Sequence, residues 1–561
     1  MAASAHGIPW TAGTGIDVNA VINSGGTGSS GRHRTLSSSS LSNHNHAPIL
    51  GPLGDAVGLT DDAVDGPSSG LTRKAAVVLG VWSGFVAIGL HAGAFGPTLP
   101  ALAARAGVGE NRMSASFLIA GVAAAFFTPL IGALSDRIGV KTSLRAMLSV
   151  ALFVDATGAA AQPRMAMLVR DWPEKYRLIP LAVLWSICGM SISTVISVGN
   201  ACAVSLFPPD PKDEAAQHDS GDDVEAAPAT APPRVKSDAL YAAVAALGCG
   251  YSIGNALATA GAGDAGIAVL DQASAILATS ATLVFVLSFL LPERDEVASG
   301  VPSQASSTLS NESTLPLLAA EPSDELAGNP MRDSETRDSA KAARKCKLID
   351  LGLALSLMFS VMVVGSEISF GSWVGSAAVH ACDATPRVSG ALGSTFWIAY
   401  TFGRMIFLGA ATRGYSPWTA LAMSYPSLLV GLGIGASMIF DAGGVWKSLH
   451  LPGDGCFPLY VGAALYGIGR SAGFISICAI VGKRKRHSAS KSATAMEQAL
   501  VGCAGSIGAA ALPCLVGALG GQSGDMVGKS LIVFVMGATA IELISLTALV
   551  CHGIDVRENE A

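Results

Sequence analysis

The sequence predicts an all-α membrane protein in which twelve transmembrane helices form two six-helix repeats. The first observation behind this prediction is composition: 50% of the residues are hydrophobic and only 14% are charged, whereas soluble domains carry about 25% charged residues. The second is a series of apolar runs of about 20 residues, the length that a helix needs to cross the hydrocarbon core of a bilayer. The third is a long polar insert in the middle of the chain, which leaves six runs on each side, as an internal repeat would.

The twelve predicted spans follow the hydropathy of the chain. They lie at roughly 75–99, 114–134, 143–161, 178–206, 239–260, 268–291, 350–380, 389–411, 418–440, 457–481, 495–519 and 527–551. The first six make a predicted N-terminal bundle over residues 73–292, and the last six make a C-terminal bundle over residues 348–552.

Four polar segments interrupt or flank these bundles. Residues 1–72 are rich in Ser, Gly and His, residues 208–237 and 293–347 are rich in Pro, Ser and acidic residues, and residues 553–561 form a short C-terminal tail. The first three bury too little apolar surface to offset the entropy of ordering them, so we predict that they are disordered. The N-terminal tail is poor in acidic residues, so a plastid-type transit peptide stays an alternative interpretation of it.

Lys and Arg are concentrated in the loops on one side of the predicted spans. If the N-terminus is cytoplasmic, the inner side holds Arg137, Lys141, Arg145, Arg413 and the basic block at residues 483–486. The positive-inside rule therefore predicts an integral multi-pass protein with both termini in the cytoplasm, in the plasma membrane or an endomembrane. The loop at residues 162–177, with four basic residues, runs against this assignment.

The ten cysteines show no paired CxxC spacing, and most lie inside apolar runs, where Cys acts as a small apolar residue. Cys382 and Cys456 fall in short polar loops, so a disulfide between them is one alternative. His44 and His46 belong to a low-complexity tail, and we interpret them as compositional drift rather than as metal ligands. No metal site and no cofactor are predicted.

The loop between the second and third predicted spans reads GALSDRIGVKTSL, residues 132–144. Its two glycines allow close helix packing and a tight turn at the membrane surface. Asp136, Arg137 and Lys141 supply charges at the helix ends, where a carboxylate can face the N-terminus of a neighbouring helix. On spacing alone, a charged latch and an ordinary basic loop fit this pattern equally well.

This loop closely resembles the signature of the major facilitator superfamily, G-x-L-x-D-R-x-G-x-K. Six positions match, namely Gly132, Leu134, Asp136, Arg137, Gly139 and Lys141. Val140 departs from the pattern, which usually has a basic residue there. The resemblance covers nearly the whole chain outside the tail and inserts, and it implies the major facilitator fold with these residues gating the cytoplasmic side. The corresponding segment in the second half, residues 402–417, adds Arg404 and Arg413 to the implied gate. Thr412 occupies the position where the signature has an aspartate.

The seventh and eighth predicted spans carry a finer resemblance. Residues 365–373 read GSEISFGSW, and Phe-Trp at 396–397 is followed by Gly-Arg at 403–404. These residues resemble the fucose-permease and sodium-dependent glucose transporter-like branches of the superfamily. The resemblance implies a sugar or similar polyol as substrate, carried with a proton or a sodium ion. The tenth span departs from this resemblance, because Arg470 lies there in a stretch of otherwise small residues.

The resemblance also implies that the first, fourth, seventh and tenth spans line a central cavity. The substrate-binding candidates are His91, Ser197, Asn200, Glu367, Trp373, Trp397, Tyr400 and Arg470. An aromatic ring at Trp373, Trp397 or Tyr400 suits stacking on a sugar ring, and an interfacial aromatic belt explains Trp373 nearly as well.

Helical spacing gives two polar faces. Ser186, Ser193, Ser197 and Asn200 share a face of the fourth span, and Gly248, Ser252 and Asn255 share a face of the fifth, beside Tyr251. Such faces offer hydrogen bonds to a polyol, and serine-mediated helix packing is the alternative.

Glu367 lies inside the otherwise apolar or small run VMVVGSEISFGSWVGSAAV. A charge in a membrane span usually faces the bundle interior or a cavity, because exposing it to lipid is costly. We hypothesise that Glu367 pairs with Arg470 and takes up a proton when the two separate; a static ion pair is the alternative. Asp155 and Glu542 lie in spans that the resemblance makes peripheral, so we favour structural pairing for both. For His91, a ligand or proton relay and a packed neutral histidine fit equally well.

Together these features predict a secondary transporter that moves a small polar solute, with a sugar or polyol favoured, by alternating access. Arg470 keeps an organic-anion carrier as an alternative, and the long acidic inserts keep a non-transporting receptor as another. The sequence contains no Walker motif and no spaced catalytic set, so neither an ATP-driven pump nor an enzyme is predicted. The expected partners are the solute, a coupling proton or sodium ion and the bilayer; we expect a monomer and no nucleic acid.

Overall fold

The computed structural model describes residues 68–138, 140–206, 239–290, 332–413, 415–440, 455–484, 493–520 and 525–557. Within these ranges all regular structure is helical. The six long helices of the N-terminal half are α2 (Ser68–Ala106), α4 (Ala115–Ile138), α6 (Ser149–Leu168), α7 (Leu178–Leu206), α9 (Ala239–Ala265) and α10 (Val269–Leu287). Short helical segments join them: α3 (Glu110–Met113), α5 (Val140–Thr142), the π-helical turn Ser143–Leu148, and 3₁₀ turns at Val169–Asp171, Glu174–Tyr176, Gly266–Ala268 and Ser288–Leu290.

The C-terminal half contributes six further spans. They are α12 (Arg332–Cys382), α13 (Pro386–Thr412), α14 (Pro417–Phe440), the pair α16 (Phe457–Arg470) and α17 (Gly473–Arg484), α18 (Ala493–Gly520) and α19 (Asp525–Arg557). The helix pair is a single predicted span that breaks just after Arg470. The start of α13 follows local rules: the Thr385 side chain accepts a hydrogen bond from the Val388 amide, and Pro386 occupies the first turn, where its missing N–H costs nothing.

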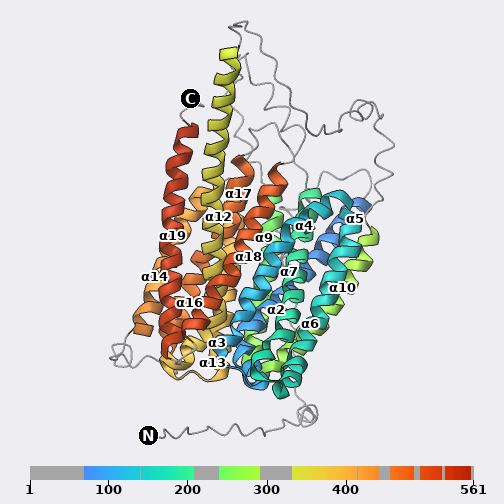
Figure 1. The fold of residues 1–561 in the computed structure, drawn as a ribbon, viewed down its shortest axis with the longest axis vertical. Coiled ribbons are helices and arrows are strands. Elements are labelled where there is room, and N and C mark those ends of the chain that lie inside the picture. The colour runs from blue at the N-terminus through green and yellow to red at the C-terminus, as the bar shows by residue number, and fades with distance from the viewer. Residues whose placement is uncertain are drawn as a thin grey trace, which may run out of the picture. The chain divides into compact units, whose positions relative to one another are not determined.

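The helices are long and apolar enough to cross a membrane. Ten stretches of the described chain meet that description; one of them, Ala245–Leu290, is 46 residues long and contains both α9 and α10. The helix α13 is not among the ten, and it carries two arginines, Arg387 and Arg404. The predicted fold class, an all-α membrane protein with twelve spans, is therefore confirmed (Figure 1).

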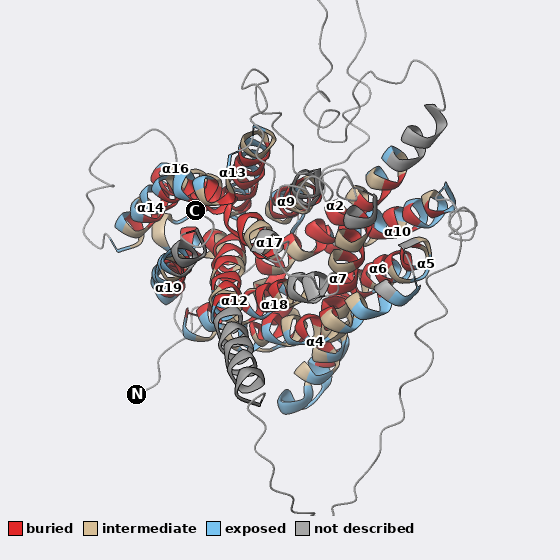
Figure 2. Ribbon diagram, turned by 90° about the horizontal axis from the view of Figure 1, so that it is seen from above, coloured by how far each residue is buried: buried red, intermediate tan, exposed pale blue. Residues whose placement is uncertain are grey.

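Large apolar side chains cover the outer faces of the bundle. Phe126 on α4, Phe153 on α6 and Ile544 on α19 are each more than 60% exposed. Figure 2 shows the buried residues on the inward faces of the helices and the exposed residues on the outward faces. A helix that is apolar on its exposed side suits lipid rather than water as its surrounding medium.

Two helices begin inside segments that we predicted to be disordered. The helix α2 begins at Ser68, inside the predicted tail 1–72, and α12 begins at Arg332, inside the predicted disordered loop 293–347. Residues 332–347 are rich in Ala, Lys and Arg, which are strong helix formers, so the apolar span that follows can extend through them. The rest of both segments, and all of 208–237, lies outside the described residues.

The two halves meet mainly along two helix pairs that lie side by side in Figure 2, α9 with α13 and α4 with α18, and α2 also contacts α12. They approach most closely toward the end of the bundle where α2 and α12 finish and α13 begins. There a Cβ on Gly96 of α2 would lie 2.7 Å from Cα of Ser372 on α12, so only glycine permits this contact. Near the same end, the Thr259 and Ser394 hydroxyls of α9 and α13 lie 3.0 Å apart.

A disulfide joins Cys382 to Cys456 at this same end, which we call the disulfide end. Cys382 is the last residue of α12, and Cys456 caps the start of α16. The two cysteines are 74 residues apart in sequence, and their Cα atoms are 5.5 Å apart, within the usual range for a bridge. The alternative that the sequence left open is thus the one that the structure contains.

Removing this bridge should lower stability measurably. A cross-link over a long loop typically contributes about 2–4 kcal/mol, so Cys382→Ser with Cys456→Ser should lower the midpoint of thermal unfolding in detergent. Cys551→Ser changes an exposed cysteine of α19 and is the matched control. An unchanged midpoint in the double variant, equal to that of the control, would show that the bridge contributes nothing.

Candidate functional site

A small cavity lies between the two halves. It has a volume of about 30 Å³ and is lined by residues of four helices, α2, α9, α12 and α13: Ala92, Gly93, Tyr251, Asn255, Ile368, Gly371, Ser372 and Trp397. A volume of this size holds about one water molecule. A solute larger than water therefore enters this cavity only if its walls move apart.

The lining combines two aromatic rings with short polar groups. The Trp397 and Tyr251 rings meet edge to face, with centroids 6.4 Å apart, across the boundary between the halves. Gly371 allows Trp397 to lie directly on α12, because a Cβ there would be 2.6 Å from the indole ring. The Asn255 amide donates to the Tyr251 carbonyl at 2.9 Å, and the Ser372 hydroxyl adds a further polar group. Few polar groups on an apolar, aromatic wall are typical of a site for a small ligand.

A buried hydrogen-bonded chain lies beside this cavity in the C-terminal half. The Tyr400 hydroxyl donates to Glu367 Oε2 at 2.6 Å, and Arg404 Nη2 donates to the same hydroxyl at 2.7 Å. The Arg404 guanidinium also lies 4.6 Å from the Tyr400 ring centroid. Glu367 precedes the cavity residue Ile368, and the Tyr400 ring contacts Trp397 with centroids 5.6 Å apart. A change in the charge of Glu367 would therefore alter the electrostatic environment of the cavity wall.

Arg404 is more central than the sequence suggested. We predicted it as part of a cytoplasmic gate, but its side chain is buried and is so close to Gly248 of α9 that a Cβ there would overlap it. Its Nε has no hydrogen-bond partner among the described residues. Arg404 thus places a buried positive charge of the C-terminal half against α9 of the N-terminal half. The Tyr400 hydroxyl links this charge to Glu367.

The predicted pair of Glu367 with Arg470 is wrong in this structure, because Arg470 pairs with Glu542 of α19. Arg470 Nη1 lies 2.5 Å from Glu542 Oε2, and Nη2 contacts Glu542 Oε1. The same Nη2 also contacts Ser366 and the carbonyls of Met362 and Val363. A bidentate pair satisfies both charges, which leaves Glu367 to Tyr400. The structural pairing favoured for Glu542 is the one found.

The other aromatic and serine candidates are placed differently. Trp373 is buried, and its indole N–H donates to the Pro513 carbonyl of α18 at 3.0 Å, so it packs between helices instead of lining the cavity. On α7, Ser193 shares a hydrogen bond with Thr128 of α4 at 2.8 Å. Ser197 is half-buried with no partner for its hydroxyl among the described residues, and Asn200 is half-buried. Neither side chain lines the cavity.

His91 also lies away from the cavity, although the next two residues, Ala92 and Gly93, line it. Its imidazole Nδ1 is 3.0 Å from Asp155 Oδ2 of α6, and its Nε2 is 2.9 Å from the Gln162 side-chain nitrogen. This is the structural pairing favoured for Asp155. Gln162 was missed, although it follows Asp155 by seven residues and so shares its helix face.

The signature loop is described in part. Arg137 is exposed and Lys141 is half-buried, while the Asp136 side chain and Gly139 lie outside the described residues. Gly132 faces α18, with a Cβ there 3.9 Å from Ala499, and Arg413 is exposed at the end of α13. The gating roles of these residues stay predictions.

Comparison with known proteins yields solved structures alone. No family model and no curated protein matches the sequence. A D-xylose-proton symporter matches with a TM-score of 0.50 and 10% identity, over 82% of this chain and 96% of its own. A bacterial homologue of the iron transporter ferroportin matches with a TM-score of 0.50 and 14% identity, over 86% of this chain and 99% of its own. The nucleoside transporter NupG matches with a TM-score of 0.49 and 13% identity, over 85% and 98%.

At these identities the symporter and the ferroportin homologue establish the fold alone. The chain has the twelve-helix major facilitator fold and is an integral multi-pass membrane protein. The proteins that share this fold here are transporters, not enzymes. The resemblance seen in the signature loop is confirmed at the level of the fold, and the finer resemblance to fucose-permease-like proteins stays a prediction.

Proposed function

We propose that this protein is a secondary transporter that carries a small polar solute, a sugar or a polyol, by alternating access. The observation that carries the proposal is the cavity at the boundary of the halves, with Trp397 and Tyr251 as ring platforms and Asn255 and Ser372 as hydrogen-bonding groups. Sugars suit such a wall, because an aromatic face covers their C–H groups while polar side chains reach their hydroxyls. Rocking of the halves would widen the cavity toward one side at a time.

The proposal includes coupling to an ion, with Glu367 as the coupling carboxylate. Glu367 is 3% exposed and is linked through Tyr400 to Arg404, at the contact between the halves. When the halves separate, Arg404 loses its contact with Gly248 of α9, so the exposure of this hydrogen-bonded chain to water changes with conformation. A carboxylate in such a position can bind a proton in one state and release it in the other. A proton is therefore the favoured ion, with sodium as the alternative.

The organic-anion alternative loses its main support. Arg470 is 2% exposed, and Glu542 and Ser366 occupy its guanidinium. An anion would have to displace a buried carboxylate from a bidentate pair, which is costly. The sugar or polyol carrier is for this reason preferred.

The disulfide supports the proposed orientation. Disulfides persist in oxidising compartments and are rare on the cytosolic side of a membrane. The Cys382–Cys456 bridge lies at the end of the bundle that the basic loops place away from the cytoplasm. Both observations support cytoplasmic termini and a non-cytoplasmic disulfide end, the lower end in Figure 1.

A panel uptake assay tests the proposed function. Cells that express the full chain are offered labelled hexoses, pentoses, polyols, nucleosides and organic anions, with and without imposed proton and sodium gradients. We expect saturable uptake of a sugar or polyol that rises with an inward proton gradient. Uptake of an anion alone, or of no solute while the protein is at the membrane, would contradict the proposal.

Trp397 should set solute affinity. Trp397→Ala removes the ring that lines the cavity, and aromatic contacts contribute about 0.5–1.5 kcal/mol, so the half-saturation concentration should rise up to about tenfold. Trp418→Ala removes a partly buried tryptophan of α14 that belongs to another apolar cluster and is the matched control. Equal half-saturation concentrations in both variants would place the solute elsewhere.

A further inference from the structure

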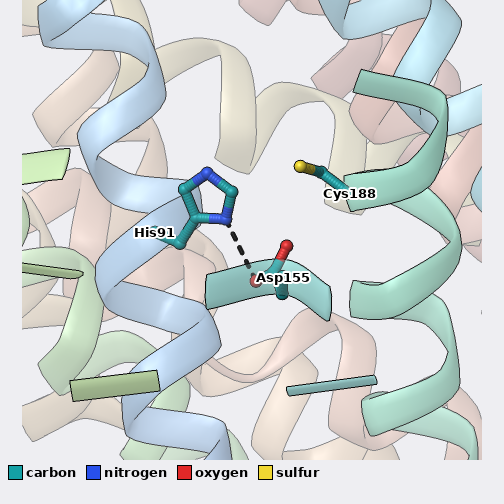
Figure 3. A group of neighbouring side chains, drawn as sticks. All are labelled: His91, Asp155 and Cys188. Atoms are coloured by element: carbon teal, nitrogen blue, oxygen red, sulfur yellow. Dashed lines mark hydrogen bonds and ion pairs between the residues drawn. The ribbon is translucent and has the colours of Figure 1, made fainter. Parts of the chain in front are cut away.

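We propose that His91, Asp155 and Cys188 form a binding site for a divalent transition-metal ion of the zinc type, buried in the N-terminal half. The three residues come from three helices, α2, α6 and α7, and their ligand atoms all lie within 4.8 Å of one another. Figure 3 shows the imidazole, the carboxylate and the thiol turned toward one another. The site lies apart from the transport cavity and needs no assumption about transport.

Burial sets this cluster apart from a chance surface group. His91 is 2% exposed, Asp155 is 0% exposed and Cys188 is 4% exposed. In a tetrahedral zinc site, metal–ligand distances of about 2.0–2.3 Å put ligand atoms roughly 3.3–3.8 Å apart. The His91 Nδ1 and Asp155 Oδ2 atoms are already 3.0 Å apart. Only a small inward movement of the Cys188 side chain is needed to complete the three-ligand set.

Two buried acceptors at the cluster lack a donor. Asp155 Oδ1 and Gln162 Oε1 have no hydrogen-bond partner among the described residues. Each buried acceptor left unsatisfied costs about 1–3 kcal/mol, so a cation at this position would be stabilising. Gln162 nitrogen lies 2.9 Å from His91 Nε2 and 3.9 Å from Cys188 Sγ. Because the two ends of a glutamine amide are assigned from their contacts, a turned amide would let the Gln162 oxygen accept a hydrogen bond from His91 Nε2–H, which leaves Nδ1 free to bind the metal.

The donor set and the charge select the class of metal. Imidazole and thiolate suit zinc-type ions, whereas magnesium and calcium prefer oxygen ligands. On binding, the Cys188 thiol loses its proton to solvent and its sulfur bonds to the metal. One divalent ion, one thiolate and one carboxylate then sum to zero charge around a neutral imidazole. A neutral site is what a membrane bundle tolerates, whereas an unpaired Asp155 carboxylate is costly there.

The metal site is joined to the cavity wall through the backbone of α2. His91 directly precedes Ala92 and Gly93, which line the cavity. A metal that ties α2 to α6 and α7 would restrain this wall of the cavity.

Metal titration of the purified full chain tests the site. The background carries His6→Ala, His33→Ala, His44→Ala and His46→Ala, so that the histidines of the N-terminal tail do not contribute. No thiol reductant is present, so that the disulfide stays intact. Cadmium serves as a probe of thiolate ligation by its ultraviolet absorbance, and zinc as a probe of thermal stability. We expect one equivalent of cadmium with a thiolate band, and a rise in the unfolding midpoint with zinc.

Variants of the ligands and one matched control interpret the result. Cys188→Ser should abolish the cadmium–thiolate band and the zinc-dependent rise, and Asp155→Asn should weaken binding by at least about tenfold, as losses around metal sites do. Cys202→Ser changes another buried cysteine of α7 outside the cluster and should bind as the parent chain does. The metal-free unfolding midpoint of each variant shows whether it is folded. Absence of binding in the parent chain, or a band that Cys188→Ser leaves unchanged, would overturn the proposal and leave His91 and Asp155 as a structural pair.

Discussion

Glu367→Gln should abolish concentrative uptake while leaving exchange of solute across the membrane intact. The amide has nearly the shape of a protonated carboxyl and still accepts the hydrogen bond from Tyr400, but it cannot release or take up a proton. A gradient of one pH unit that drives one proton per solute sustains about tenfold accumulation, or about 1.4 kcal/mol. In the variant the internal and external solute concentrations should therefore become equal. Accumulation and counterflow of the same labelled solute are measured side by side.

A matched carboxylate controls this experiment. Glu174→Gln changes an exposed acid that pairs with Arg112 at 2.5 Å. Glu174 is not on any of the four helices that line the cavity. The control should accumulate solute as the parent chain does. Wild-type accumulation in Glu367→Gln would remove Glu367 from the coupling step, whatever the solute.

Arg470→Leu should be the most destabilising single substitution in the C-terminal half that we consider. It leaves the Glu542 carboxylate buried without its partner, at 0% exposure. Breaking one side of a buried ion pair costs about 3–5 kcal/mol. We expect a large fall in the yield of folded protein and in the unfolding midpoint in detergent.

The double variant separates charge from packing. Arg470→Leu with Glu542→Leu removes both charges, and replacing a whole buried pair by apolar residues is often neutral or stabilising. It should therefore recover most of the stability that the single variant loses. If the double variant stays as unstable as Arg470→Leu alone, the lost contacts of Arg470 with Ser366 and the α12 carbonyls, and not the unpaired Glu542 charge, account for the instability.

The fold was predictable because it depends on quantities that sequence displays directly. Apolar runs of membrane length, separated by polar inserts, define the spans without any knowledge of their neighbours. The helix α12 begins at Arg332, before the apolar span, where a polar segment rich in Ala, Lys and Arg leads into it. Hydropathy ends such a span at the membrane surface, whereas the backbone continues the helix past it.

The pairing of charges was less predictable, because helical spacing shows which residues share a face and not which helix that face meets. Glu367 and Arg470 both belong to spans expected to be central, so they were joined. Arg470 turns instead toward Glu542 on α19, and Glu367 turns toward Tyr400 on α13. The same limit explains Trp373, whose partner on α18 could not be read from its own helix.

The sequence feature that did indicate site residues was a repeat of polar residues along one helix face. Asn255 and Tyr251 were identified on the fifth span in this way, and both line the cavity. Asp155 and Gln162 form a similar face on the third span and meet His91 there. Cys188 was taken as a small apolar residue, and only the packing of α7 against α6 and α2 brings its thiol to that cluster.

Solute flux through the purified protein tests whether this chain is a transporter. The full chain is reconstituted into liposomes loaded with the unlabelled solute that the uptake panel identifies, and entry of the labelled solute is followed over time. We expect saturable counterflow, which Trp397→Ala shifts to higher solute concentrations and Glu367→Gln preserves. Saturable binding of the solute with no entry into the vesicle lumen would contradict transport and would favour a receptor built on the same fold.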